Sequence, residues 1–503
     1  MTTVTLSLVS HTNAGKTTLA RTLLGRDVGE VRDAPHVTEL AERHTLITSP
    51  QGDTLSLWDT PGFGDSARLV RRLQQSSNPL GWFLSAVWDR WRDRPFWASQ
   101  QVMRHVQAQS DVVLYLVNAA ESPEAAAYVE PEMALLGWLG KPVLVLLNQL
   151  GAPRDPAAEA AEVQAWRSHL GKLPLVQAVL PMDAFARCWV HEQVLLNAVQ
   201  AALQVGPAQA MARLRTAWSA RQQGTLQAAT QVLAEGLAQM AVSREAVETD
   251  AHWGERLRRL GAALAQREGA SADAAAQRRL AEAGEARVRE DTTRLLTLHG
   301  LQGQAQGEIL ARVATQFTVR ERLPEGRAAM VGAAVSGALV GLKADIASGG
   351  LTLGGGMLVG GILGALGAGG LARGINLVRG TEQGWVAWSE PALDAAVQAA
   401  LLRYLAVAHF GRGRGDWSQG EAPAHWHDTV LAALAPYQAG FAAVWQSRSG
   451  KAEGVVPPEA LSRALQPLLH MAVTDVLERL YPAAVPASAK AAPQSPQPPT
   501  ASS

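Results

Sequence analysis

A group of residues near the N-terminus has the types and the spacing of a phosphate-binding loop. Residues 10–17 read Ser-His-Thr-Asn-Ala-Gly-Lys-Thr, and they lie between an apolar run, 4–9, and a helix-like segment that begins at Thr18. A strand, a loop and a helix in this order surround an anion with backbone N–H groups and a helix N-terminus. We expect Lys16 to reach the terminal phosphates of a nucleotide and the Thr17 hydroxyl to bind magnesium.

The loop departs from the usual motif at one position. A glycine normally lies six residues before the lysine, and here that position is Ser10. The alternative is an ordinary strand-to-helix turn that contains Gly-Lys-Thr. On the nucleotide-binding interpretation, the residues that contact the phosphates are Ser10, Asn13, Ala14, Gly15, Lys16, Thr17 and Thr18.

A second motif follows at the distance that a nucleotide site requires. The alternating run 54–58 predicts a strand, and it ends in Asp59-Thr60-Pro61-Gly62. In nucleoside-triphosphate switches such an aspartate holds magnesium, and the glycine N–H contacts the γ-phosphate. We assign these functions to Asp59 and Gly62. Two motifs in order on two predicted strands indicate a P-loop nucleotide domain.

A third position is expected to read the base. A further apolar run ends in Asn148-Gln149-Leu150-Gly151, and both Asn148 and Gln149 are predicted to contact the nucleotide. GTPases carry an aspartate at the position of Gly151, and its carboxylate accepts hydrogen bonds from guanine. Asp155 and Asp183 are carboxylates near enough in sequence to replace it. The choice between guanine and adenine therefore stays open.

The three motifs together resemble those of bacterial GTPases related to Era and to the tRNA-modification GTPase TrmE. Nearly the whole chain also resembles a proteobacterial subfamily in which such a domain is fused to a C-terminal helical domain. The resemblance implies an α/β P-loop domain with a mostly parallel sheet and helices on both faces. It also implies that GTP and GDP are the ligands and that GTP hydrolysis depends on Mg²⁺.

The resemblance makes three residues informative about mechanism. Ras-like enzymes place a water-orienting glutamine after the Asp-x-x-Gly glycine, but here Phe63 occupies that position and cannot bind water. TrmE-like relatives use an asparagine at the position of Asn13 to bind K⁺. Asn13 either does the same or favours the turn conformation of the loop. Thr38 is the candidate switch threonine that completes magnesium coordination, with Thr45 and Thr48 as alternatives.

Composition limits the remaining function classes. The chain has 503 residues, enough for about three domains. Lysine plus arginine and aspartate plus glutamate both number 45, so nucleic-acid binding is not indicated. The single cysteine, Cys188, excludes an intramolecular disulfide and fits a reducing cytoplasm. The N-terminus lacks a charged region before its first apolar run, so a signal peptide is not expected.

A tryptophan-rich insertion follows the magnesium aspartate, and it spans about 66–108 within a GTPase domain assigned to 1–204. Its aromatic residues are Trp82, Phe83, Trp88, Trp91, Phe96 and Trp97. One interpretation is that these rings pack on the sheet or on the helical domain. The other is a docking surface for an unknown protein partner or a membrane, controlled by the nucleotide.

Residues 205–481 form the predicted helical domain, and a Pro-, Ala- and Ser-rich tail, 482–503, is predicted to be disordered. Apolar residues recur at helical spacing in two segments of this domain, and such stripes are core contacts. They are Leu226, Leu233, Leu237 and Met240 in one segment, and Leu280, Val288 and Leu295 in the other.

A glycine-rich apolar hairpin is predicted at about 328–372. Gly356, Gly360 and Gly364 recur at every fourth residue, a spacing that lets helices approach closely. Each glycine costs about 1 kcal/mol against alanine in an exposed helix, so something must enclose this segment. It is either buried in the helical domain or contacts the membrane, and we favour membrane contact. The corresponding location is the cytoplasm, at the inner membrane.

These observations predict a magnesium-dependent GTP hydrolase, stimulated by potassium, that acts as a nucleotide switch for the helical domain. Lys16 and Thr38 are its expected catalytic residues. Thr17, Thr38 and Asp59 are the expected magnesium ligands. Two alternatives remain: a scaffold or membrane-anchoring protein that binds nucleotide without hydrolysing it, and an ATPase of the same fold.

Overall fold

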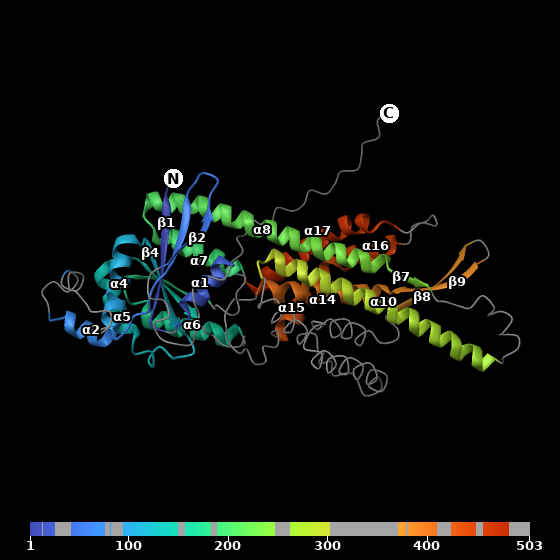
Figure 1. Ribbon diagram of the computed structural model, residues 1–503, viewed down its shortest axis with the longest axis horizontal. Helices are drawn as coiled ribbons and strands as arrows, with labels where there is room; N and C mark the ends of the chain where they lie inside the picture. Colours follow the sequence, from blue (N-terminus) through green and yellow to red (C-terminus); the bar gives the residue numbers. More distant parts are fainter. Residues whose placement is uncertain are drawn as a thin grey trace, which may run out of the picture.

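A computed structural model places two domains end to end (Figure 1). A sheet covered by helices forms the N-terminal domain, and long helices form the C-terminal domain. The structure describes residues 1–12, 14–25, 42–75, 81, 94–148, 156–182, 189–246, 262–301, 371–378, 381–409, 424–448 and 456–481.

Strands and helices alternate through most of the N-terminal domain, as expected for a parallel sheet joined by helical crossovers. The strands are β1 (Thr3–Ser10), β2 (Glu42–Thr48), β3 (Thr54–Asp59), β4 (Val112–Asn118), β5 (Val143–Asn148) and β6 (Val176–Pro181). The helices are α1 (Lys16–Leu24), α2 (Ser66–Leu73), α4 (Arg94–Gln109), α5 (Val129–Leu139), α6 (Pro156–Leu170) and α7 (Trp189–Ala202).

The six strands form one sheet in the order β2-β3-β1-β4-β5-β6. All neighbouring pairs are parallel except β2 with β3, which are antiparallel. The carboxyl ends of β1, β3, β4 and β5 therefore meet at one edge of the sheet. Ligands of open α/β sheets bind at this edge, and the loops that carry the three sequence motifs leave from it.

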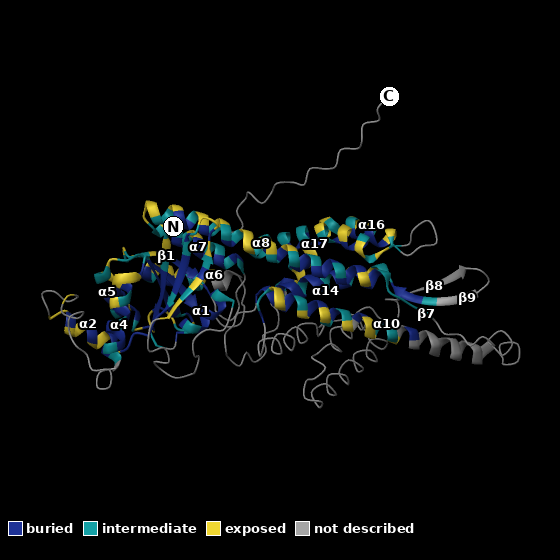
Figure 2. Ribbon diagram, turned by 45° about the horizontal axis from the view of Figure 1, so that its top comes forward, coloured by how far each residue is buried: buried dark blue, intermediate teal, exposed yellow. Residues whose placement is uncertain are grey.

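Alternate residues of the strands fill two separate cores. Val112, Leu114 and Leu116 of β4 belong to the core on one face, and Val113, Tyr115 and Val117 belong to the core on the other. Helices α1, α7 and the start of α8 (Val205–Val242) cover the first face, and α2, α4, α5 and α6 cover the second. Figure 2 shows the inner strands of the sheet buried between the helices, whereas β2 at the sheet edge is mostly exposed. The predicted fold class of this domain is confirmed.

Helix α8 joins the two domains. Its first half packs against the sheet through side chains such as Leu214 and Trp218, and its second half enters the core of the helical domain. The other helices of that domain are α10 (Ala262–Leu298), α14 (Glu390–Ala408), α15 (Ala424–Leu434), η2 (Ala435–Tyr437), α16 (Gln438–Ser447) and α17 (Pro458–Leu480).

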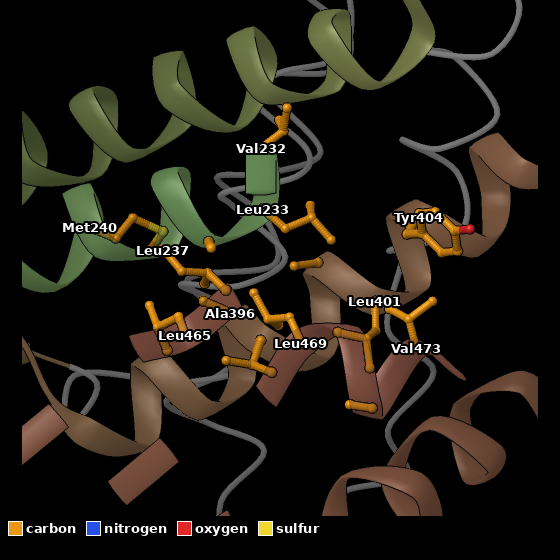
Figure 3. Close-up of a cluster of buried hydrophobic side chains, with 14 of the residues drawn as sticks. Val232, Leu233, Leu237, Met240, Ala396, Leu401, Tyr404, Leu465, Leu469 and Val473 are labelled. Carbon is orange, nitrogen blue, oxygen red and sulfur yellow. The ribbon is translucent and has the colours of Figure 1, made fainter. Parts of the chain in front are cut away.

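One continuous core holds the helical domain together. Leu233 and Leu237 of α8 lie on the side of the helix that faces Leu465 and Leu469 of α17 (Figure 3). Every residue of the two predicted apolar stripes lies in this core. The prediction that these stripes are core contacts is confirmed.

The C-terminal domain also contains a small sheet that the sequence did not predict. Strands β7 (Arg244–Ala246), β9 (Thr381–Trp388) and β8 (Leu371–Val378) pair antiparallel in that order. The sheet lies at the end of the molecule far from the N-terminal domain (Figure 1). Alanine and glycine in β8 weaken the strand signal in the sequence. The expected glycine-rich hairpin overlaps the start of β8 at residues 371–372, and its other residues lie outside the described part of the chain.

Part of the tryptophan-rich insertion is described, and that part packs on the N-terminal domain. Phe96 of α4 is 1% exposed, belongs to the core of the second face and lies beneath the Arg68 guanidinium, 4.9 Å from its ring centroid. Residues 82–93, which include four of the six aromatic residues named above, lie outside the described residues.

One described helix, α14, is long and apolar enough to cross a membrane by length and composition. Buried residues make up 61% of its most apolar window, as in the core helix of a water-soluble domain.

Candidate functional site

The loop after β1 has the backbone form that the phosphate-binding interpretation requires. Gly15 adopts the left-handed conformation, with φ of 85°, and is the N-cap of α1. Glycine occupies this region without the steric cost that a side chain brings. Lys16, 8% exposed, is the first residue of α1, and its Nζ donates a 3.1 Å hydrogen bond to Ser10 Oγ. The serine that departs from the usual motif therefore holds the lysine at the loop.

Thr17 and Asp59 lie in direct contact, although 42 residues separate them in sequence. The Thr17 hydroxyl donates a 2.5 Å hydrogen bond to Asp59 Oδ2. Asp59 is 3% exposed, and its other oxygen, Oδ1, is buried without a hydrogen-bond partner among the described residues. A hydroxyl beside an unsatisfied buried carboxylate oxygen is a donor set that suits Mg²⁺.

Burial controls the titration of the charged groups here. It lowers the pKa of Lys16, and the carboxylates of Asp59 and Glu132 oppose this effect. It also raises the pKa of Asp59, while Lys16 and the Thr17 hydrogen bond lower it. Burial thus disfavours the charged form of both side chains, and the opposite charges beside them favour it. The Lys16 ammonium would attract a phosphate group, and the Asp59 carboxylate would attract a cation.

Asn148 connects the end of β5 to the phosphate-binding loop. Its side chain is fully buried, and Nδ2 donates a 2.9 Å hydrogen bond to the carbonyl oxygen of Ala14. The asparagine of the third motif therefore supports the loop from the neighbouring strand. Residues 149–155, which include Gln149, Gly151 and Asp155, and Asp183 lie outside the described residues.

The segment after β3 lies against the phosphate-binding loop. The Thr60 hydroxyl donates to the Leu8 carbonyl oxygen at 2.5 Å, and the Phe63 N–H donates to the Ser10 carbonyl oxygen at 2.9 Å. A Cβ atom on Gly62 would lie 2.9 Å from the Cα atom of Thr12, so only glycine fits here without a shift. The Phe63 ring is fully buried in the core of the second face.

Comparison with known proteins agrees with this geometry. A family model described as the 50S ribosome-binding GTPase matches residues 5–149. Over these residues the N-terminal domain is similar to a P-loop GTPase domain. The matched residues contain the phosphate-binding loop, the Asp59 motif and Asn148 of the GTPase domain. No curated protein matches the chain.

Several solved GTPase structures are similar to part of the chain. Era from Aquifex aeolicus bound to GDP and AlF₄⁻ is 18% identical, with a TM-score of 0.31 over 41% of this chain. Era in complex with MgGDPNP and a segment of 16S ribosomal RNA is 19% identical over 41% of this chain, with a TM-score of 0.30. The chain spans 58% of the length of each Era chain. Toc33 from Arabidopsis thaliana is 14% identical, with a TM-score of 0.26 over 37% of this chain and 73% of its own.

The structure brings most of the predicted site residues of the GTPase domain together. Around the loop lie Ser10, Ala14, Gly15, Lys16, Thr17, Thr18, Asp59, Gly62 and Asn148. Asn13, Thr38 and Gln149 lie outside the described residues, so potassium binding and the switch threonine stay predictions.

Sequence reasoning missed Glu132, a buried residue that contacts the phosphate-binding loop. Glu132, fully buried in the first turn of α5, contacts His11 of the loop at 2.7 Å. These residues are 121 positions apart, and no motif connects them. The sequence offers one signal: Glu132 lies among apolar residues in the segment 129–139.

Proposed function

We propose that the protein binds and hydrolyses GTP in a magnesium-dependent reaction and acts as a nucleotide switch for its helical domain. The contact between the Thr17 hydroxyl and the Asp59 carboxylate is the main support. It joins the phosphate-binding loop to the end of β3, so one cation there would respond to both elements.

The residues of the site have separate functions in this proposal. Lys16 supplies positive charge to the terminal phosphates, and Thr17 and Asp59 hold Mg²⁺. When bound, Mg²⁺ neutralises charge that develops on the phosphate oxygens. Gly62, close against the loop, offers its N–H to the γ-phosphate. Because Phe63 is buried and has no hydrogen-bonding group, intrinsic hydrolysis is slow until the switch segments are ordered.

Helix α8 offers a physical path to the helical domain. Arg213 forms a 2.6 Å ion pair with Asp53 in the turn between β2 and β3, and Arg221 donates to the carbonyl oxygen of Leu46 in β2 at 3.3 Å. Strand β3 ends at the magnesium residue Asp59, and β2 follows the predicted first switch. A shift of these strands with nucleotide state would move α8, whose second half is built into the helical core.

Competition between nucleotides tests the proposal most directly. The full chain should bind GTP in the presence of Mg²⁺, and excess ATP should displace it poorly. Lys16→Ala should lose nucleotide affinity and hydrolysis, whereas Lys141→Ala, just before β5 at the opposite edge of the sheet, should keep both. Full affinity and hydrolysis in Lys16→Ala would rule the proposal out, and equal competition by ATP would favour an ATPase.

A second candidate function is a nucleotide-binding scaffold without hydrolysis. Its support is the buried Phe63 in place of a water-orienting glutamine. Single-turnover assays in K⁺ and in Na⁺ separate the two functions. Phosphate release that is faster in K⁺ supports a hydrolase with a potassium site at Asn13, and no release with either ion supports the scaffold.

We further propose that the protein acts in the cytoplasm at the inner membrane, through the glycine-rich segment 328–372. The support is the spacing of its glycines in the sequence. Flotation of the full chain with vesicles of bacterial lipids tests this, and a variant without residues 328–370 is the control. Equal recovery of both proteins in the lipid-free fraction would contradict it. We propose no nucleic-acid partner, because basic and acidic residues are equal in number.

A further inference from the structure

Glu132 lies at the centre of a buried network behind the phosphate-binding loop. Its Oε1 accepts hydrogen bonds from His11 Nδ1 at 2.7 Å and from the Ser66 hydroxyl at 3.4 Å. Its Oε2 accepts one from the Tyr115 hydroxyl at 2.7 Å. Carboxylates are rarely fully buried, and this one is satisfied by three donors from three separate elements.

The three donors differ in what they are attached to. Tyr115 lies in the middle of β4, where it is fully buried in the core of the second face. His11 belongs to the phosphate-binding loop, and its ring also stacks on Tyr128, with 4.7 Å between the ring centroids. Ser66 is the first residue of α2, four residues after Gly62. Glu132 therefore joins strand β4 to the phosphate-binding loop and to the segment that follows Gly62.

Other bonds hold the same segment in register with the loop. Phe63 and His11 form a parallel β-bridge. On the other side, the Gly64 N–H donates to the Ser99 hydroxyl of α4 at 3.2 Å. A Cβ atom on Gly64 would lie 2.5 Å from Pro95, so the backbone fits tightly there as well. The hydrogen bond from Ser66 to Glu132 is a further contact that holds this segment in place.

Glu132 also acts electrostatically on the phosphate-binding lysine. Burial lowers the pKa of Lys16. The carboxylates of Asp59 and Glu132 raise it again, because both favour the charged form of the lysine. Asp59 is the proposed magnesium ligand, so a bound cation would take up its charge. Burial raises the pKa of Glu132, and the hydrogen bonds from His11 and Tyr115 oppose this effect and favour the charged form.

We propose that Glu132 is a positioning residue for γ-phosphate hydrolysis, and that it acts through His11 and Ser66 to hold the phosphate-binding loop and residues 60–66 in one arrangement. The inference rests on the proposed function. It explains how the Gly62 N–H is kept in place in a chain that has Phe63 where a glutamine would orient water. The carboxylate takes no part in bond making or breaking.

Kinetics of Glu132→Gln provide the first test, because the amide keeps the size of the side chain but removes its charge. Its kcat for GTP should fall about 10- to 100-fold, the cost of a small misplacement. Its Kd for GDP should change by less than about 3-fold, because the phosphate contacts of Lys16 and the loop remain. Glu192→Gln is the matched control, since Glu192 is a buried carboxylate of α7 that accepts a 3.1 Å hydrogen bond from Gln222. It should keep the parent kcat.

Ser66→Ala provides a second variant that removes a single hydroxyl. Its kcat should also fall, and the double variant with Glu132→Gln should be no slower than Glu132→Gln alone, because the two residues act as a unit. Ser110→Ala, a buried serine at the amino end of β4, is the control. Parent-like kcat in both single variants, or losses that simply multiply in the double variant, would overturn the proposal.

Amide hydrogen exchange separates this inference from the proposed function. With GDP bound, Glu132→Gln should exchange faster than the parent in residues 10–15 and 60–66, and Glu192→Gln should not. This measurement needs nucleotide binding but no hydrolysis. Unchanged exchange in both segments would refute the positioning of the loop by Glu132, even if the parent protein hydrolyses GTP. Faster exchange in Glu132→Gln, together with a parent protein that releases no phosphate, would support the coupling and contradict only the proposal of GTP hydrolysis.

Discussion

Arg213 Nε lies 2.6 Å from Asp53 Oδ2, and this ion pair joins the first half of α8 to the turn between β2 and β3. Asp53 also accepts a hydrogen bond from the backbone N–H of Thr2 at 2.9 Å. The helix that continues into the C-terminal domain is thus fixed to the strand that carries Asp59. The Arg213 hydrogen bond and the Thr2 N–H together lower the pKa of Asp53 to about 2.

This depressed pKa predicts a pH-dependent contribution of Asp53 to stability. A carboxyl group with a lower pKa in the folded state stabilises the fold above its unfolded pKa, and it loses this effect as the pH falls toward the folded value. The difference in urea midpoint between the parent and Asp53→Asn should be constant from about pH 7 to pH 5 and shrink below about pH 4. A difference that does not change down to pH 3 would contradict the assignment.

Gly236 of α8 is predicted to be intolerant of a side chain. A Cβ atom there would lie 1.7 Å from Asp291 Oδ2, so Gly236→Ala should destabilise the protein by about 1–3 kcal/mol or more through overpacking. Gly224→Ala, on the same helix with no atom within 4 Å of its Cβ position, should instead stabilise it by about 0.5–1 kcal/mol. Urea unfolding of both variants measures the contrast, and two shifts of the same sign would refute it.

Asp291 and Arg403 are oppositely charged residues buried in the helical core, 2% and 6% exposed. Asp291 also forms a 3.3 Å ion pair with Arg287 on its own helix. Burial raises the pKa of Asp291 to about 6, and the charge of Arg403 is the largest influence that opposes this. Asp291→Leu should destabilise the fold by about 3–5 kcal/mol, because it leaves the buried Arg403 charge without the carboxylate that favours it. Arg403→Met should cost less, because Asp291 keeps its ion pair with Arg287. The double variant should lose less than the sum. Additive losses in a double-mutant cycle would show that the two charges are independent.

The raised pKa of Asp291 also gives a direction with pH. A carboxyl group with a higher pKa in the folded state binds more protons there than in the unfolded chain between about pH 4 and pH 6. Its contribution to stability therefore falls as the pH rises through this window. The urea midpoint of the parent, relative to that of the double variant, should decline from pH 4 to pH 6. A relative midpoint that rises over this range would show that Asp291 is better stabilised as the anion.

Asp59→Asn should separate magnesium binding from nucleotide binding. The amide keeps the shape of the side chain and can still accept the Thr17 hydrogen bond, but it removes the charge that would hold Mg²⁺. Loss of a metal ligand of this kind should weaken the magnesium-dependent part of GTP affinity by about 10- to 100-fold. Titration of GTP and GDP with Mg²⁺ and with a chelator measures this part, and an unchanged Mg²⁺ dependence would contradict the assignment.

Asn148→Ala should destabilise the conformation of the phosphate-binding loop without changing Lys16 itself. It removes the 2.9 Å hydrogen bond to the Ala14 carbonyl oxygen and leaves that group without this partner, at a cost of about 1–3 kcal/mol. Affinity for both GTP and GDP should fall by about 10- to 100-fold, with a similar factor for each. Asn118→Ala, at the end of the neighbouring β4, is the comparison variant. An Asn148→Ala protein with parent affinity would show that the loop keeps its form by itself.

The sequence alone determined the elements of the nucleotide site. Apolar runs predict where the strands lie. Gly15, Lys16, Thr17 and Asp59 come closely after those runs, so each is predicted to lie at or just beyond the end of a strand. Parallel strands bring their carboxyl ends to one edge, so local patterns were enough to predict that these residues meet. The apolar stripes of the helical domain were predictable for the same reason, because helical periodicity is a local property.

Tertiary structure decided which residues surround that site. Glu132 faces His11 across 121 positions, and Arg213 faces Asp53 across 160. Neither pair has a sequence signature, because each depends on how α5 and α8 pack on the sheet rather than on local spacing. The antiparallel sheet of β7, β8 and β9 was missed likewise. Strand β7 pairs with β9 across more than 120 residues. Strands β8 and β9 are neighbours in sequence, but the alanine and glycine of β8 weaken its strand signal. The site residues at strand ends could therefore be predicted from the sequence. The buried residues that support them could not, because long-range packing brings them there.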